Sequence, residues 1–163
     1  MSFSRICRHL FSAGHGLRRA FNTQALAAIE QAIRETEQQH GGEIRFAIEN
    51  NLDLQELWQD LSPRSRAIDA FAHLRVWDTE LNNGVLIYVL WADHDVEIVA
   101  DRGYASRVGE QQWREICQRM EQSFAIGQPE QAAVEGVRAV GQLIAQHFPL
   151  TDRNELPDRP VFL

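Results

Sequence analysis

The feature that most constrains this chain is an unbroken apolar run, VLIYVLWA, at residues 85–92. A strand with one face in water alternates apolar and polar residues, but this run is apolar at every position. It is also far too short to be a helix that crosses a membrane. The run therefore predicts a central β-strand whose two faces are both covered by helices.

Two further strands are predicted beside this one. Residues 43–50 alternate between apolar and mixed side chains, and residues 96–100 follow a short turn at Asp93 and His94. A connection of two residues makes the second and third strands antiparallel. The first and second strands are separated by a helical segment, so we expect them to run parallel through a right-handed crossover.

Amphipathic patterns predict the helices that cover this sheet. They extend over residues 22–39, 62–77, 113–124 and 133–148. Asn22 and Ser62 are suitable N-caps for the first two. The order of elements predicts a three-layer α/β/α sandwich with a short mixed central sheet of about three or four strands. Periodicity leaves open whether residues 50–62 hold another short strand.

The chain divides into one domain, residues 22–148, and two flanking segments. Residues 149–163 form an irregular tail that ends on an apolar Val-Phe-Leu. Residues 1–21 form a basic amphipathic segment that could lie on a membrane surface or dock on a partner; the simpler alternative is a short helix packed on its own domain. No run has the length of a transmembrane span or the form of an export signal. We therefore expect a soluble, cytoplasmic protein, peripheral to a membrane if residues 1–21 bind one.

Composition excludes several classes of function. The net charge is −7, which disfavours nucleic acid as a main partner. All 16 basic residues are arginine, so neither a phosphate-loop lysine nor Schiff-base chemistry is available. Cys7 and Cys117 are too far apart for a zinc-ligand spacing, and Cys117 lies in a helical apolar stripe typical of a core residue.

Polar residues gather where the second strand begins and the third ends, which the topology places at one end of the sheet. The oxygen-bearing side chains there are Asp78, Asn82, Asn83 and Asp101, the ligand types that hold Ca²⁺ or Mg²⁺. Arg102 beside them is a candidate to bind an anion. The alternative is ordinary turn chemistry, because Asp and Asn cap helices and tolerate turn conformations.

A secondary acidic cluster is predicted at the opposite end of the sheet. Glu49 ends the first strand, and Asp93 and Asp95 flank the turn between the second and third. These three carboxylates could bind a cation together. The alternative is that they are solvated residues of an exposed turn.

The runs GEIRFAIEN and TELNNGVLIYVL, followed by VEIVADRGY and Trp113, also resemble the TPM domain family over residues 22–148. That family includes thylakoid proteins linked to photosystem II repair and many bacterial proteins, often membrane-anchored. The resemblance implies an α/β/α sandwich, a calcium site at one end of the sheet in some members, and acid phosphatase activity in a plant member. By position it implies Asp78, Asn82, Asn83 and Asp101 as the polar site. The final NELPDRPVFL resembles the tail of a small soluble bacterial subgroup.

Two functions follow as hypotheses. The first is a cation-binding domain, with Ca²⁺ or Mg²⁺, that acts as an interaction or assembly module in the maintenance of membrane proteins. Its partner would be a protein, such as one associated with a membrane. The second is a weak metal-dependent phosphomonoesterase, in which the cation polarises a phosphoryl oxygen and Arg102 balances charge.

Overall fold

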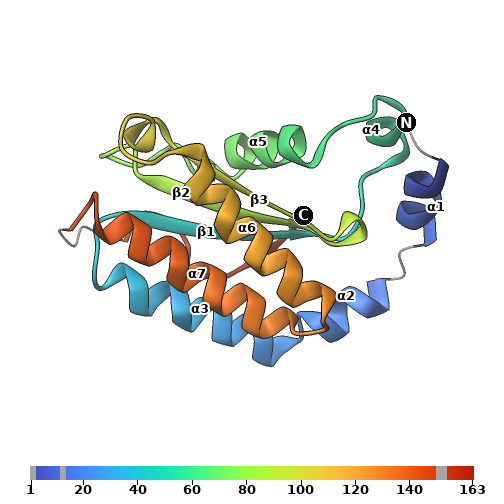
Figure 1. Ribbon diagram of the computed structural model, residues 1–163, viewed down its shortest axis with the longest axis horizontal. Helices are drawn as coiled ribbons and strands as arrows, with labels where there is room; N and C mark the ends of the chain where they lie inside the picture. The colour runs from blue at the N-terminus through green and yellow to red at the C-terminus, as the bar shows by residue number, and fades with distance from the viewer. Residues whose placement is uncertain (1–2, 12–13, 150–153) are drawn as a thin grey trace.

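The computed structural model describes residues 3–11, 14–149 and 154–163. The described elements, in chain order, are α1 (Phe3–Phe11), α2 (Gly14–Ala20), α3 (Thr23–Glu37), β1 (Glu43–Glu49), α4 (Leu54–Trp58), α5 (Pro63–His73), β2 (Gly84–Leu90), η1 (Trp91–Asp93), β3 (Asp95–Ala100), η2 (Arg102–Tyr104), α6 (Glu110–Ala125), α7 (Pro129–Ala145) and β4 (Val161–Phe162). Together they form a three-layer α/β/α sandwich around one mixed sheet, as predicted (Figure 1).

The four strands lie in the order β3-β2-β1-β4. β1 and β2 are parallel over their full lengths, from Glu43 opposite Gly84 to Glu49 opposite Leu90. β2 and β3 are antiparallel, and the two-residue β4 runs parallel to β1. The parallel crossover and the antiparallel hairpin predicted from the sequence are both confirmed.

The sheet separates two hydrophobic cores. Helices α3, α6 and α7 cover one face and pack on the alternate residues that include Phe46 and Ile87. Helices α4 and α5 cover the other face and pack on the set that includes Ala47 and Tyr88. Every residue of β1 and β2 is buried, which confirms the central strand with two covered faces.

The structure settles one point that the sequence left open and differs from the prediction at two places. The segment 50–62 holds the short helix α4, which Asp53 and Glu56 begin with a capping box. The tail, predicted to be irregular, supplies the edge strand β4. The hairpin connection is longer than two residues: Leu90 pairs with Asp95, and the intervening chain forms η1 before a left-handed residue at His94.

Glu37, in the last turn of α3, ties that helix to the edge of the sheet. One carboxylate oxygen accepts a hydrogen bond from the backbone N–H of Ile44 at 2.8 Å. The other oxygen is buried and has no hydrogen-bond partner among the described residues. The pKa of Glu37 is raised to about 8, chiefly by burial; the Ile44 hydrogen bond opposes this shift, and the nearby carboxylates of Glu43 and Asp158 add to it.

This raised pKa predicts that stability falls with pH. The protonated form of Glu37 is favoured in the folded state, so its contribution is complete below pH 4.5 and is lost as pH rises through about 8. In this window the free energy of unfolding should fall by at most about 1.4 kcal/mol per pH unit. Glu37→Gln, which does not titrate, should flatten the profile measured by urea denaturation. Glu35→Gln, at an exposed site on the same helix, should reproduce the wild-type slope, and equal slopes for all three proteins would contradict the prediction.

Candidate functional site

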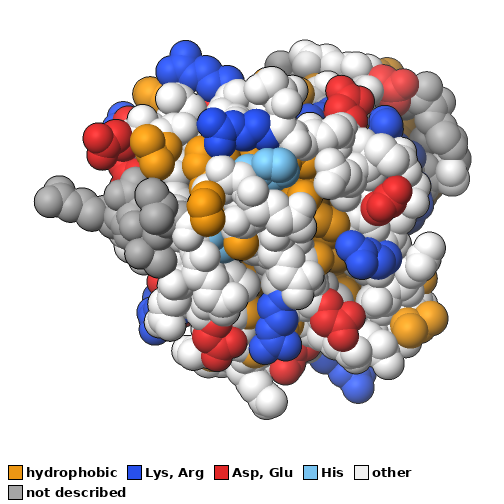
Figure 2. All heavy atoms as spheres, turned by 60° about the vertical axis from the view of Figure 1, so that its left-hand side comes forward, with side chains coloured by type: hydrophobic (Ala, Val, Ile, Leu, Met, Phe, Trp, Pro, Cys, Tyr) orange, Lys and Arg blue, Asp and Glu red, His pale blue; other side chains and the backbone are white. Residues whose placement is uncertain are grey.

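The residues of the two predicted clusters lie toward the two ends of the sheet. The loops before β2 and after β3 meet at one end, and the loops after β1 and β2 meet at the other. Figure 2 views the molecule from the side that holds the first of these ends. Acidic, basic and apolar side chains are interspersed there, so this face has no large patch of one charge.

The loop before β2 and the loop after β3 are bonded to each other. The backbone N–H of Asp101 donates to Gly84 O at 2.9 Å, and that of Gly103 donates to Asn82 O at 3.0 Å. The Nε of Arg102 donates to the side-chain Oδ1 of Asn82 at 2.7 Å. The structure thus places Asn82, Asp101 and Arg102 in one loop pair.

Two glycines allow close backbone packing here. A Cβ at Gly103 would lie 2.4 Å from Asn82 O, and one at Gly84 would lie 2.0 Å from Val76 O, in the turn after α5. Real Cβ atoms do not approach backbone oxygens so closely, so a side chain at Gly103 would push the two loops apart, and one at Gly84 would displace the Val76 turn. Asn82 itself has a left-handed backbone, with φ of 53°, which asparagine tolerates better than most residues.

The Asp101 carboxylate has one bonded oxygen and one unbonded oxygen. Its Oδ1 accepts the backbone N–H of Arg102 at 2.7 Å and thereby caps η2. Its Oδ2 is buried and has no hydrogen-bond partner among the residues that the structure describes. A buried carboxylate oxygen without a partner is costly. A cation at this oxygen would remove that cost.

The other two predicted ligands lie apart from this pair of loops. The side-chain amide of Asn83 is completely buried and donates to Gly41 O, on the side of β1 and away from β3. The backbone O of Asn83 accepts the hydroxyl of Tyr104 at 2.9 Å. Asn83 therefore acts as an internal anchor of the loops. Asp78 is exposed on the preceding turn, and its side chain forms no hydrogen bond to Asn82 or Arg102 within the described chain.

Residues 3–11, 14–149 and 154–163 contain no group of three or more His, Cys, Asp or Glu side chains arranged to hold a metal ion. A site at the loop pair would therefore depend on one carboxylate, from Asp101, and on the amide oxygen of Asn82. Cysteine does not provide another ligand: Cys117 is buried in the core, and burial raises its pKa to about 12.

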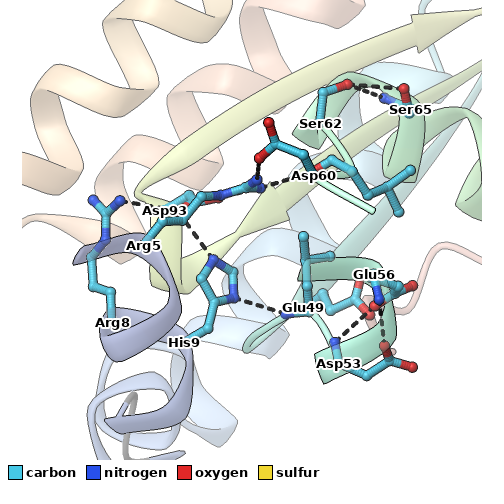
Figure 3. A network of polar contacts seen from close by, with 12 residues as sticks. Arg5, Arg8, His9, Glu49, Asp53, Glu56, Asp60, Ser62, Ser65 and Asp93 are labelled. Atoms are coloured by element: carbon cyan, nitrogen blue, oxygen red, sulfur yellow. Dashed lines mark hydrogen bonds and ion pairs between the residues drawn. The ribbon is translucent and has the colours of Figure 1, made fainter. Parts of the chain in front are cut away.

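At the opposite end, Asp93 is enclosed by basic side chains of α1 (Figure 3). Its Oδ2 accepts from the Nε of Arg5 at 2.9 Å, and its Oδ1 lies 3.1 Å from Nε2 of His9 and 3.3 Å from a terminal nitrogen of Arg8. The Nδ1 of His9 accepts the backbone N–H of Leu52 at 2.9 Å. Helix α1 thus docks on the domain through its basic side chains.

Glu49 and Asp95, the other members of the secondary cluster, are also shielded from solvent: Glu49 is buried and Asp95 is partly buried. Arg66 binds both oxygens of Glu49, at 2.8 and 2.9 Å, and the hydroxyl of Tyr88 donates to the same carboxylate. The pKa of Asp95 is raised to about 7, chiefly by burial and next by the neighbouring carboxylate of Glu97. The three carboxylates are held separately, each in a different environment, so they do not form one open site.

Sequence reasoning missed the partners of these carboxylates. Arg5 and His9 precede Asp93 by more than eighty residues, and Arg66 follows Glu49 after a loop and a helix. No spacing in the sequence connects them. The only available signal was the basic amphipathic pattern of residues 1–21, which indicated that the segment docks on something without identifying the surface.

The TPM domain family model matches residues 18–143. The chain belongs to the TPM domain family. Among curated proteins, none matches the sequence.

Solved structures agree with this assignment. This TPM domain is similar to the BA42 protein of the psychrophilic bacterium Bizionia argentinensis, with 30% identity and a TM-score of 0.74 over 87% of this chain and 94% of that one. It also shares its fold with the N-terminal domain of a protein from P. gingivalis, at 18% identity and a TM-score of 0.59 over 77% of this chain and 76% of the other. Among the described residues, no helix combines the length and apolarity needed to cross a membrane.

The α1 contacts predict a specific effect of removing the Asp93 charge. Asp93→Asn would leave Arg5, Arg8 and His9 without their shared anion, so α1 should detach more often. The half-buried thiol of Cys7 on α1 should then react about tenfold faster with a maleimide, while buried Cys117 stays protected. Asp69→Asn, at an exposed position on α5, should leave the rate unchanged. Equal rates in all three proteins would show that Asp93 does not hold α1.

Proposed function

We propose that this TPM domain binds a divalent cation, Ca²⁺ or Mg²⁺, at the loop pair of Asn82 and Asp101, and acts as an interaction module. The observation that carries this proposal is the buried, unbonded Oδ2 of Asp101. It lies on a loop that is hydrogen-bonded to the loop bearing Asn82, whose Oδ1 is a second hard oxygen ligand.

The residues present supply only some of the ligands that such a site needs, and this shortfall indicates the kind of function. Ca²⁺ takes about six to eight oxygen ligands and Mg²⁺ about six. Asp101 and Asn82 provide two, while Asn83 bonds Gly41 through its amide nitrogen and keeps its Oδ1 buried in the interior, and Asp78 is exposed on the preceding turn. Water or a partner's oxygens would have to fill the remaining positions. A bound cation would therefore supply an electrostatic bridge to an acidic group of a partner, which suits an interaction module.

Arg102 is the residue that would regulate this binding. Its guanidinium is a positive charge that already occupies Oδ1 of Asn82. A cation and this guanidinium compete for one oxygen, so the arginine has to turn outward when the cation binds. An exposed, released arginine can then bind a carboxylate or phosphate of the partner in a forked geometry.

We keep hydrolysis of phosphomonoesters as the alternative. The same cation would polarise a phosphoryl oxygen, and Arg102 would balance the developing charge. It ranks second because the side-chain hydrogen bond at the loop pair joins Arg102 to Asn82, neither of which is a nucleophile or a general base. If the wild-type protein hydrolyses an aryl phosphate and Asp101→Asn does not, this alternative is favoured.

A calcium titration followed by backbone NMR tests the cation site. Saturable shifts are expected for residues 82–84 and 101–104. Asp101→Asn should weaken binding about tenfold or more, because it removes the only charged ligand. Arg102→Gln should strengthen binding, because it removes the competing positive charge. Asp69→Asn is the control for a loss of surface charge. Absence of any shift, or equal affinity in all four proteins, would refute the proposal.

We further propose that the end of the molecule that holds α1 docks on an anionic membrane surface. Helix α1 faces the domain with Arg5 and His9, and none of its described side chains belongs to either core. Leu10 on this helix is 57% exposed. The Trp58 side chain of neighbouring α4 is 73% exposed, and exposed arginines of α1 and α2 lie nearby in the chain. Apolar side chains beside arginine are the composition that binds anionic lipid.

Vesicle sedimentation tests this surface. The protein should bind phosphatidylcholine vesicles that contain phosphatidylglycerol and should not bind those without it, because the attraction is partly electrostatic. Leu10→Asp and Trp58→Asp should each reduce binding, whereas Trp77→Asp, at a half-exposed site near the other end of the sheet, should not. Failure of the wild-type protein to bind anionic vesicles would assign this surface to a protein partner instead.

A further inference from the structure

The outer edge of β1 is occupied by a segment of the chain that lies beyond the family domain. Residues 154–163 follow the matched region, which ends at residue 143. Val161 and Phe162 of β4 pair with Ala47 and Ile48 of β1. The backbone N–H of Leu163 extends this pairing by donating to Ile48 O at 3.0 Å.

Two buried side chains of β1 bind the backbone of this segment. The guanidinium of Arg45 donates to the carbonyl oxygens of Pro157 and Arg159, the latter at 2.6 Å. A carboxylate oxygen of Glu43 accepts the backbone N–H of Leu156 at 3.0 Å. Since these contacts involve only main-chain atoms of the tail, they would hold any extended peptide that follows the same path.

Apolar side chains of the tail supply further contacts, beside two polar ones: Asp158 pairs with Arg34 at 3.1 Å, and the carboxylate of Glu155 accepts the backbone N–H of Glu80 at 3.2 Å. Leu156 is buried in the core on the α5 side of the sheet, and Val161 and Leu163 pack against the same core. Phe162, which alternates with them, is 45% exposed. The groove therefore selects apolar residues at the first, sixth and eighth positions of an eight-residue stretch, and Arg34 favours an acidic residue at the third.

An exposed strand edge offers unpaired backbone groups to other chains, and proteins cover such edges. Here the cover consists of the tail and of Glu37, which bonds the edge N–H of Ile44. The regular pairing between tail and sheet is short, because β4 contains two residues against seven in β1. A short strand held by main-chain clamps is suited to exchange with a competing strand.

We propose that the edge of β1 is a peptide-binding groove, and that residues 154–163 are its resident occupant, which an extended segment of a partner protein displaces. The partner segment carries apolar side chains at the spacing of Leu156, Val161 and Leu163. The tethered tail competes as an intramolecular ligand, so a partner binds only when its affinity or local concentration exceeds that of the tail. The groove lies at the opposite edge of the sheet from β3, and its binding does not require the cation proposed for Asn82 and Asp101.

A fluorescent peptide with the sequence of residues 154–163 is the probe, with anisotropy as the readout. In the full-length protein, Leu156→Asp combined with Val161→Asp should release the tail and leave the groove intact. This variant should bind the peptide about tenfold or more tightly than the wild-type protein does, because the tethered competitor is lost. The full-length Phe162→Asp variant should behave as wild type. A labelled peptide with the same two Asp substitutions should not bind.

Equal peptide affinity in the released variant and the wild type, with circular dichroism showing both folded, would overturn the proposal. Hydrogen exchange of the wild-type protein gives a second test that needs no variant. The amides of Leu156 and Leu163 should exchange through a local opening, faster than Ile87 in β2. Exchange of all three at the rate of global unfolding would mean that the tail does not leave the groove. If the protein instead forms a dimer by exchanging tails as its concentration increases, the groove binds a second copy of this chain, and the proposal of a separate partner is wrong.

Discussion

Burial of β1 and β2 on both faces is the constraint on which the rest of this structure depends. All residues of both strands are buried, and full burial of a Val, Leu or Ile side chain is worth about 1.5–3 kcal/mol. Helices must therefore cover both faces, and the connection between the strands must cross one of them. Polar residues are displaced from the strand centres to the strand ends, so any binding chemistry has to lie there or along the sheet's edges.

The carboxylates at the two ends of the sheet have different bonding partners. Glu49 is paired with Arg66, and Asp93 with Arg5, so neither presents a free negative charge. Asp101 receives one backbone hydrogen bond and keeps a buried oxygen without a partner. Asp95 at the opposite end also has a buried Oδ1 without a hydrogen-bond partner among the described residues. The cation proposal therefore rests on Asp101 together with Asn82, whose loops are bonded to each other. The opposite end has a structural role, in which Asp93 holds the N-terminal helix.

The sequence predicted the layers, the directions of three strands and the meeting of the Asn82 and Asp101 loops, because these follow from apolar periodicity and crossover rules. It did not predict side-chain directions: Asn83 follows Asn82 directly, yet its amide bonds Gly41 on the side of β1. Strand β4 was missed because its pairing depends on Arg45, which binds carbonyl oxygens more than a hundred residues away. Helix α4 was missed although Asp53 and Glu56 form a capping box, since its five residues are too few for a helical period.

The central claim is that the unbonded oxygen of Asp101 and the amide oxygen of Asn82 share a cation. A crystal structure with Mn²⁺, which accepts the same hard oxygen ligands and scatters anomalously, tests it most directly. The account predicts an anomalous peak in contact with both oxygens, with the Arg102 guanidinium turned away from Asn82. A structure in which Arg102 still donates to Asn82, with no peak at Asp101, would contradict it.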